Sequence, residues 1–188
     1  ELPVFYGSDL CSTQTSVAIR NFLAYEPYDD STTVNKLSYY KNFGCVIARN
    51  DTYSIGIKAG HNQEEHNHND VASFAVVAKN KQLLCDLGAP LYTMHSLRAE
   101  NYDKVIERSS FGHNVPIING TPQRFGRQYC GEMKVEGNHI TIDFAKAYSV
   151  EINKLTRSLD LMEDKILLSD EFDENVSWQE RFVTETEP

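Results

Sequence analysis

The sequence predicts an all-β fold, an antiparallel β-sandwich, with a short N-terminal helical segment. Short apolar or alternating segments recur between turn residues at intervals of about 8–12 positions, which is typical of a sandwich. Only residues 12–25 carry the apolar stripe of an amphipathic helix. With 188 residues, 40% of them hydrophobic, the chain is expected to form a single β-sandwich domain over 1–188. Because it begins at Glu1 and not at Met, we expect it to be a fragment of a longer protein.

The predicted strands before residue 90 form two hairpins, which pair 45–49 with 53–59 and 71–78 with 82–87. The turn sequences are Asn50-Asp51-Thr52 and Lys79-Asn80-Lys81. Residues 71–78 are a continuous apolar run with β-branched side chains, which suits a strand in the middle of the sandwich that is buried on both faces.

The C-terminal half contains four further alternating segments, at 131–135, 139–144, 154–161 and 165–172. Gly137-Asn138 is a strong tight-turn signal between the first two, and Glu163-Asp164 turns the chain before the last. Trp178 is expected in the core. The interval 88–127 shows little strand pattern, and intervals of that length in compact domains are usually functional or disordered.

The net charge of −9 argues against a general nucleic-acid binder or a protein that binds anionic membranes. No apolar run reaches the roughly 18–20 residues of a membrane span. The charge is uneven, because residues 95–130 contain five cations against three acids. This local excess would attract an anionic ligand, and Arg98 is our candidate contact. An ordinary mixed surface is the alternative.

The most informative stretch is His66-Asn67-His68-Asn69-Asp70, since five of the six histidines lie between residues 61 and 113. Imidazole is the commonest metal ligand and titrates near neutral pH, so the stretch indicates a metal site, acid–base chemistry or both. In an extended strand, alternate residues share a face, and His66 and His68 would converge. Asp70 is either a further ligand or a cap.

The predicted hairpin selects three metal-ligand candidates. His68 leads into its first strand and Asp86 ends its second, so pairing brings both to the same end of the sheet. His113, in the long interval, completes a His/Asp/His set of the kind that holds zinc. For each residue alone, the alternative of capping a turn and bonding backbone is more common. For the three together we favour the metal.

Other side chains near this set suit a carbohydrate. The amides of Asn67 and Asn114 are good partners for a sugar or for backbone. Tyr92, in the long interval, would stack on a sugar or pack as an ordinary amphipathic ring. His66, beside the metal set, is the candidate acid, base or carboxylate partner, with an exposed histidine as the alternative.

These motifs resemble the signature of heparinase II/III-family polysaccharide lyases. The resemblance covers about residues 55–125 and comprises Lys58-Ala59-Gly60, His66 to Phe74, Asp86-Leu87-Gly88, Tyr92-Thr93, Tyr102, Ser109 to Asn114, Ile117 to Gly120, and Gln123. That family pairs an N-terminal (α/α) toroid of helices with a C-terminal antiparallel β-sandwich. This chain resembles the sandwich alone.

The resemblance implies that His68, Asp86 and His113 hold zinc and that His66 faces the substrate cleft. The implied reaction is β-elimination at a uronic acid. The uronate carboxylate is neutralised, a base removes the C5 proton, and an acid, typically a tyrosine, protonates the leaving oxygen. Since that tyrosine comes largely from the helical domain, we expect the isolated chain to bind zinc with little or no lyase activity.

The implied partners are an anionic, uronate-containing polysaccharide and the N-terminal helical domain of the same parent chain, with no nucleic acid and no membrane. A homodimer is left open, and family members are mostly periplasmic or secreted. Two other functions remain. One is a non-catalytic carbohydrate-binding sandwich, and the other a cupin-like metal-dependent enzyme that uses His66, His68 and His113. The cupin scheme fits poorly, because the strands lack its glycine-rich pattern.

Overall fold

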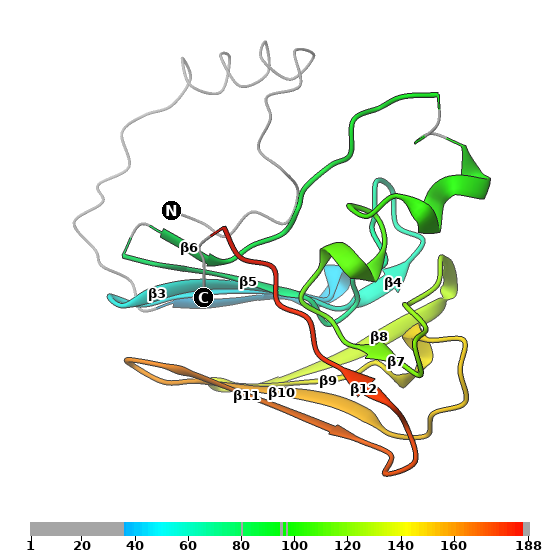
Figure 1. Ribbon diagram of the computed structural model, residues 1–188. Helices are drawn as coiled ribbons and strands as arrows, with labels where there is room; N and C mark the ends of the chain where they lie inside the picture. Colours follow the sequence, from blue (N-terminus) through cyan, green and yellow to red (C-terminus); the bar gives the residue numbers. More distant parts are fainter. Residues whose placement is uncertain (1–35, 80, 95, 97, 186–188) are drawn as a thin grey trace.

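The computed structural model describes residues 36–79, 81–94, 96 and 98–185. The predicted helical segment at 12–25 and His95 lie outside the described residues. Within them, two five-stranded antiparallel sheets face each other, which confirms the predicted antiparallel sandwich (Figure 1). The described helices are short 3-10 turns, and none is long and apolar enough to cross a membrane.

The first sheet has the strand order β1-β2-β3-β5-β6. Its strands are β1 (Lys36–Tyr40), β2 (Cys45–Arg49), β3 (Tyr53–Lys58), β5 (Phe74–Ala78) and β6 (Lys81–Leu84). Both predicted hairpins are present, because β2 pairs with β3 and β5 pairs with β6. Strand β1 was not predicted, and the first 3-10 turn, η1 (Lys41–Phe43), connects it to β2.

The second sheet has the strand order β11-β10-β9-β8-β4. Its strands are β4 (Gly60–Asn62), β8 (Gly126–Glu136), β9 (His139–Asp143), β10 (Leu155–Leu161) and β11 (Ile166–Phe172). Gly60, at a φ of +78°, turns the chain from β3 in the first sheet into β4 in the second. The predicted tight turn at Gly137-Asn138 joins β8 and β9, with Gly137 at a φ of +61°.

Short elements cover one end of the sandwich. They are the two-stranded pair of β7 (Ile117–Ile118) with β12 (Trp178–Gln179) and the 3-10 turns η2 (Ala99–Lys104), η3 (Ser110–Gly112) and η4 (Ala145–Ala147). The interval predicted to lack strands therefore holds η2, η3 and β7. Trp178 packs against the core but is only partly buried. Its ring stacks on that of Phe172, with 4.3 Å between the ring centroids.

The core lies between the two sheets and is built from alternating inward side chains of both. Ile55 and Ile57 of β3 meet Ile140 and Ile142 of β9 in one fully buried cluster. Every second residue of β10 is buried, as expected for a strand with one face on the core. One of those inward positions is not apolar, because Arg157 occupies it.

Arg157 is fully buried and connects four segments of the chain. Its Nε and Nη2 donate to the two carboxylate oxygens of Asp170 at 2.9 and 2.7 Å, and Nη2 also donates to Glu180 at 2.9 Å. Its Nη1 donates to the backbone carbonyls of Ala72 and Asn114 at 2.9 and 2.7 Å. The side chain thus ties β10 and β11 to the C-terminal segment and to two loops outside the second sheet.

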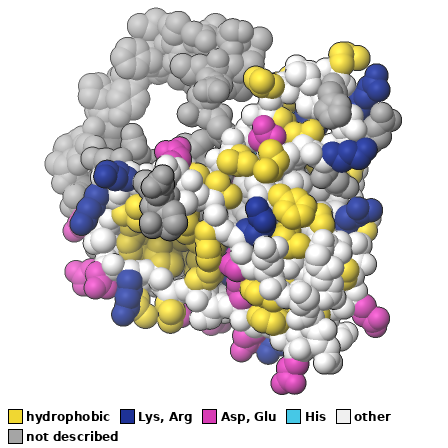
Figure 2. Space-filling model, in the orientation of Figure 1, with side chains coloured by type: hydrophobic (Ala, Val, Ile, Leu, Met, Phe, Trp, Pro, Cys, Tyr) yellow, Lys and Arg dark blue, Asp and Glu magenta, His cyan; other side chains and the backbone are white. Residues whose placement is uncertain are grey.

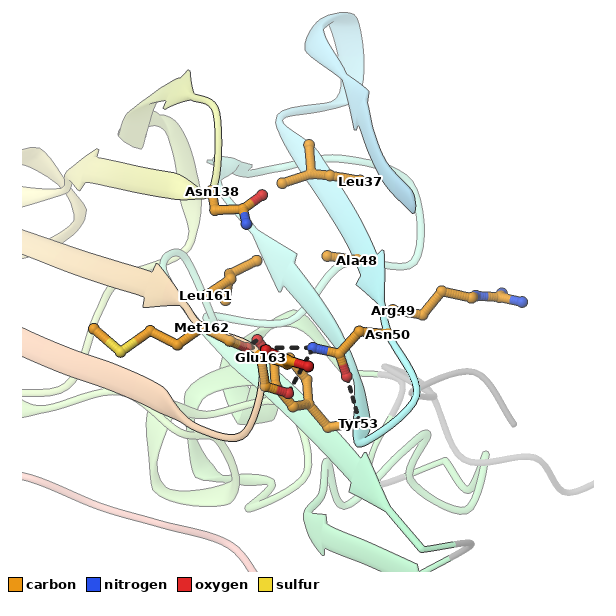
Figure 3. Close-up of a pocket in the computed structure, with 9 residues that line it drawn as sticks. All are labelled: Leu37, Ala48, Arg49, Asn50, Tyr53, Asn138, Leu161, Met162 and Glu163. Carbon is orange, nitrogen blue, oxygen red and sulfur yellow. Dashed lines mark hydrogen bonds between the residues drawn. The ribbon is translucent and has the colours of Figure 1, made fainter. Parts of the chain in front are cut away.

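The opposite end of the sandwich is closed by hydrogen bonds between turns (Figure 3). Asn50 donates to the carbonyls of Met162 and Glu163 at 3.3 and 3.2 Å, and the Tyr53 hydroxyl donates to Met162 at 2.6 Å. A cavity of about 450 Å³ lies here, with the side chain of Arg49 pointing away from it. Because the amide and the hydroxyl already bond the neighbouring turn, we regard this cavity as a structural feature.

Replacing Arg157 with methionine tests the importance of its buried network. The substitution keeps most of the side-chain volume but leaves Asp170 and Glu180 without their cation in a largely buried site. Breaking such a pair typically costs about 3–5 kcal/mol. We expect R157M to lower the free energy of unfolding by that amount in urea titrations followed by circular dichroism.

The matched control is Lys154→Met, which removes an ion pair with Glu171 whose side chains are 56% and 66% exposed. An exposed pair of this kind contributes less than about 1 kcal/mol. If R157M were no more destabilising than K154M, the network would not have the structural importance assigned to it here.

Candidate metal centre

The three predicted metal ligands converge at one end of the first sheet. His68, Asp86 and His113 each offer one ligand atom, and these atoms lie within 4.8 Å of one another. The side chains of His113 and Asp86 are 0% and 2% exposed, and His68 is also buried. The two imidazole rings lie 5.2 Å apart between centroids. Three separate segments of the chain therefore build one compact, buried donor set.

The β5–β6 hairpin brings the first two of these residues together, as predicted. His68 precedes β5, and Asp86 follows β6. Since the two strands pair antiparallel, the residues before β5 lie beside those after β6.

Hydrogen bonds then hold the loop that carries His113 against the segment that carries His68. The backbone N–H of Asn69 donates to the carbonyl of Arg108 at 2.8 Å. The Ser110 hydroxyl donates to the carbonyl of Asn69 at 2.8 Å and accepts from the N–H of Gln123 at 3.0 Å. These contacts fix the distance between the two histidines without any contribution from a metal.

Asn114, predicted to bind substrate, has a structural role. It is fully buried, and its Nδ2 donates to the carbonyls of Phe74 and Cys85 at 2.6 and 3.0 Å. Its Oδ1 accepts from the N–H of Val183 at 2.7 Å. The amide therefore bonds the backbone at the end of the β5–β6 hairpin and in the C-terminal segment, so we do not retain it as a substrate contact.

The electrostatics of the cluster keep one histidine neutral and pair the other with the carboxylate. Burial, the largest cause, and the nearby His113 together lower the pKa of His68 to about 4. Burial also acts to lower the pKa of His113, but the hydrogen bond and charge of Asp86, whose Oδ2 lies 2.7 Å from Nδ1, raise it overall. Burial raises the pKa of Asp86. A neutral imidazole is the form that binds a metal.

Asp70 lies outside this donor set. Its carboxylate is fully buried and forms an ion pair with the ammonium group of Lys58. Burial acts to raise the pKa of Asp70, but the charge and hydrogen bond of Lys58, together with the two nearby histidines, lower the pKa overall. Asp70 thus adds a negative charge beside the cluster without being one of its three ligands.

The donor set fits a divalent metal such as zinc. Two nitrogens and one oxygen match the ligand types that zinc prefers in proteins. The Nε2 atom of His113 is buried and has no hydrogen-bond partner among the described residues. A buried polar nitrogen without a partner costs free energy, and a metal ion would remove that cost.

His66 does not lie in an extended strand, so the strand argument for its orientation was wrong. The segment forms a turn, and His66 has a φ of +57°, in the left-handed region that non-glycine residues seldom adopt. His66 is exposed, whereas His68 is buried. Strained backbone of this kind is common at functional sites.

His66 and His68 nevertheless line the same cleft, which has a volume of about 360 Å³. His66, Asn67 and His68 line it together with Tyr92, which is 60% exposed. Asn67 is buried, donates to its neighbour's carbonyl at 2.9 Å, and accepts a hydrogen bond from Tyr102. The structure thus brings the predicted catalytic residue and two predicted substrate residues beside the metal cluster.

Arg98, the remaining predicted substrate residue, is exposed at the start of η2 and is not among the residues that line this cleft. Figure 2 shows several Lys and Arg side chains over the loop that contains η2, while acidic side chains gather toward the lower edge, over the second sheet. The uneven charge read from the sequence is therefore visible on this face, and Arg108 is the arginine that reaches the cleft.

Comparison with known proteins identifies the family. The family described as "Heparinase II/III-like, C-terminal" matches residues 32–175. The chain belongs to this family. A solved heparinase III structure shares its fold, with a TM-score of 0.64 at 16% identity over 90% of this chain. The chain spans 29% of the length of that heparinase III. No curated protein shows significant sequence similarity to it.

Two features of this heparinase II/III-like cleft were not expected. In the sequence, Arg108 is one of the five cations of residues 95–130 and has no other distinguishing feature. Phe125 belongs to no motif, and an aromatic residue in a loop usually packs against its neighbours. Both line the cleft. An arginine and an aromatic residue reach it from positions that sequence spacing alone does not connect to His66.

The pKa of His68 can be measured directly in the metal-free chain. Since its folded value of about 4 lies below the ordinary 6.5, the neutral form stabilises the fold above pH 6.5, and that stability is lost as the pH falls toward 4. We expect NMR titration of the imidazole resonances to give a midpoint near 4. A midpoint near 6.5 would contradict the burial described here.

Proposed function

We propose that this chain is the zinc-binding β-sandwich domain of a polysaccharide lyase that cleaves uronic-acid-containing polysaccharide by β-elimination. The observation that supports it most strongly is the buried cluster of His68, Asp86 and His113, which lies beside a cleft that also contains His66. Family membership is consistent with this activity in the parent protein.

In this proposal His68, Asp86 and His113 hold the metal. Zinc would supply a fixed positive charge that links the β5–β6 hairpin to the loop after η3. The 2.7 Å contact between Asp86 and His113 shows that these two candidate ligands lie together without a metal. The metal and its ligands would thereby keep this part of the cleft in one arrangement. Other side chains of the cleft, among them His66, would carry out the reaction on the substrate.

His66 is the group that meets the substrate. The C5 proton of a uronate is too weakly acidic to be removed at neutral pH unless the adjacent carboxylate is neutralised. An exposed imidazole can donate a hydrogen bond to that carboxylate or transfer a proton, and the guanidinium of Arg108 adds positive charge to the same cleft. Asn67 and Tyr92 would contact the sugar hydroxyls and ring.

The remaining catalytic groups would come from an N-terminal helical domain of the same parent chain. This chain spans only 29% of the length of heparinase III, so a complete lyase of that kind contains much more than the sandwich. We therefore propose that the sandwich forms one wall of the active site and is inactive by itself. Such an enzyme would act in the periplasm or outside the cell, where polysaccharide is available.

The two alternative functions differ in what they require of His66. A cupin-like enzyme needs His66 among the metal ligands, but the cluster within the described residues contains His68, Asp86 and His113 instead. A non-catalytic carbohydrate-binding sandwich needs the cleft without chemistry at His66.

Zinc binding provides the first test. We expect equilibrium dialysis and elemental analysis to find one zinc per chain, and His113→Ala or Asp86→Asn to weaken binding severely, because three protein ligands are the minimum for such a site. His139→Ala is the matched control, since His139 forms a similar 2.6 Å pair with Asp160 but is 43% exposed. Circular dichroism verifies that each variant folds. Full zinc retention by H113A and D86N would contradict the assignment.

Lyase activity provides the second test. The isolated chain should produce no unsaturated uronate from heparan or alginate, whereas a single chain that also contains the parent's helical domain should do so. In that active protein, His66→Ala should lower kcat at least about 100-fold, as expected for loss of a proton-transfer group. Rapid turnover by the isolated chain would contradict the division of the site between two domains.

A further inference from the structure

The cleft contains an aromatic side chain with no role in the proposed reaction. Phe125 lines the same cavity as His66 and His68, and its side chain is 44% exposed. Its ring has no hydrogen-bonding group and cannot take part in proton transfer. Its place in the cleft therefore calls for a role in binding.

The ring of Phe125 is supported by Tyr102, which also lines the cleft. It packs against the ring of Tyr102 at 4.8 Å between centroids, with 53° between the planes. The Tyr102 hydroxyl donates to the carbonyl of Asn67. The guanidinium of Arg108 lies 5.0 Å from the centre of the Tyr102 ring, and Arg108 is itself buried and donates to the carbonyl of Ser96.

The backbone on both sides of Phe125 is fixed as well. Gln123 is fully buried, and its amide bonds both the N–H and the carbonyl of Val71, at 2.9 and 2.8 Å. The N–H of Arg124 donates to the carbonyl of Ala147 at 3.2 Å, and Gly126 begins β8 and pairs with Asn62 of β4. The ring is therefore presented to the cleft in a preset direction, and a ligand would not have to order it.

The chemistry of the platform points to a sugar ring. The C–H bonds on one face of a pyranose form an apolar surface that packs well on an aromatic ring, while its hydroxyl and carboxylate groups need polar partners. Phe125 offers the first kind of contact, and His66, Asn67 and Arg108 offer the second within the same cavity. Tyr92, also strongly exposed there, adds a second aromatic surface.

We propose that Phe125, supported by Tyr102, forms a stacking subsite for a pyranose ring of the uronate polysaccharide. This inference rests on the proposed function and deepens it. A phenyl ring packs on the apolar face of a sugar ring and does not recognise the charge of the sugar. By stacking on one sugar ring, Phe125 determines where the polysaccharide lies along the cleft. It contributes affinity to different uronate polymers alike.

The test is oligosaccharide binding by the zinc-loaded chain. The probes are a heparan tetrasaccharide and a mannuronate tetrasaccharide, studied by calorimetry and saturation-transfer NMR. We expect Phe125→Leu to raise the Kd for both tetrasaccharides about three- to tenfold, the range expected for loss of one aromatic stacking contact. Phe125→Tyr should retain binding. Phe43→Leu, at a phenylalanine that is 75% exposed and does not line the cleft, should leave it unchanged.

Each outcome decides the subsite separately from the proposed function. Unchanged binding by F125L would overturn the subsite, as would failure of the unaltered chain to bind either tetrasaccharide. Zinc content is measured on the same samples. Loss of zinc binding by the unaltered chain would instead contradict the proposed function, whereas weaker sugar binding by F125L with zinc retained supports the subsite.

Discussion

The structure depends on one buried arginine. The guanidinium of Arg157 is neutralised by Asp170 and Glu180, and it donates to the carbonyls of Ala72 and Asn114. Asn114 directly follows His113, and Ala72 lies four residues after His68, so both are close in sequence to candidate metal ligands. The second sheet thus holds, through a single side chain, the two loops that supply the histidines of the metal cluster. A buried cation with this many partners is costly to remove and specifies one arrangement of the loops around it.

This arrangement places two neighbouring histidines in different environments. His68 is buried, and burial lowers its pKa to about 4, so it is neutral and ready to bind a metal. His66, only two residues earlier, is exposed and has left-handed backbone geometry. The turn at 63–66 directs the two imidazoles to different environments within one cleft. His66, which is exposed and has strained backbone, thus lies beside segments that hydrogen bonds hold in place. Functional sites often contain strained residues that the surrounding structure stabilises.

Much of the fold and the metal cluster could be predicted from the sequence, because both follow from local patterns. Apolar runs and turn residues located the β5–β6 hairpin, and its antiparallel pairing is what brings His68 and Asp86 together. The turn at His66 could not be predicted, since a run of polar residues has no periodicity to reveal its conformation. Asn114 fits a sugar and a backbone carbonyl equally well, and only its neighbours show which partner it has. Arg157 occupies an alternating inward position of β10, where pattern alone favours an apolar residue.

The central claim is that His68, Asp86 and His113 form one zinc site whose geometry the surrounding structure sets in advance. The most direct measurement is a crystal structure of the zinc-loaded chain with anomalous diffraction recorded on both sides of the zinc absorption edge. We expect one strong anomalous peak within bonding distance of a nitrogen of each histidine and an oxygen of Asp86, with the cleft beside it unchanged. A peak elsewhere in the molecule, or a Zn²⁺ ion bound by His66 in place of one of the three, would contradict it.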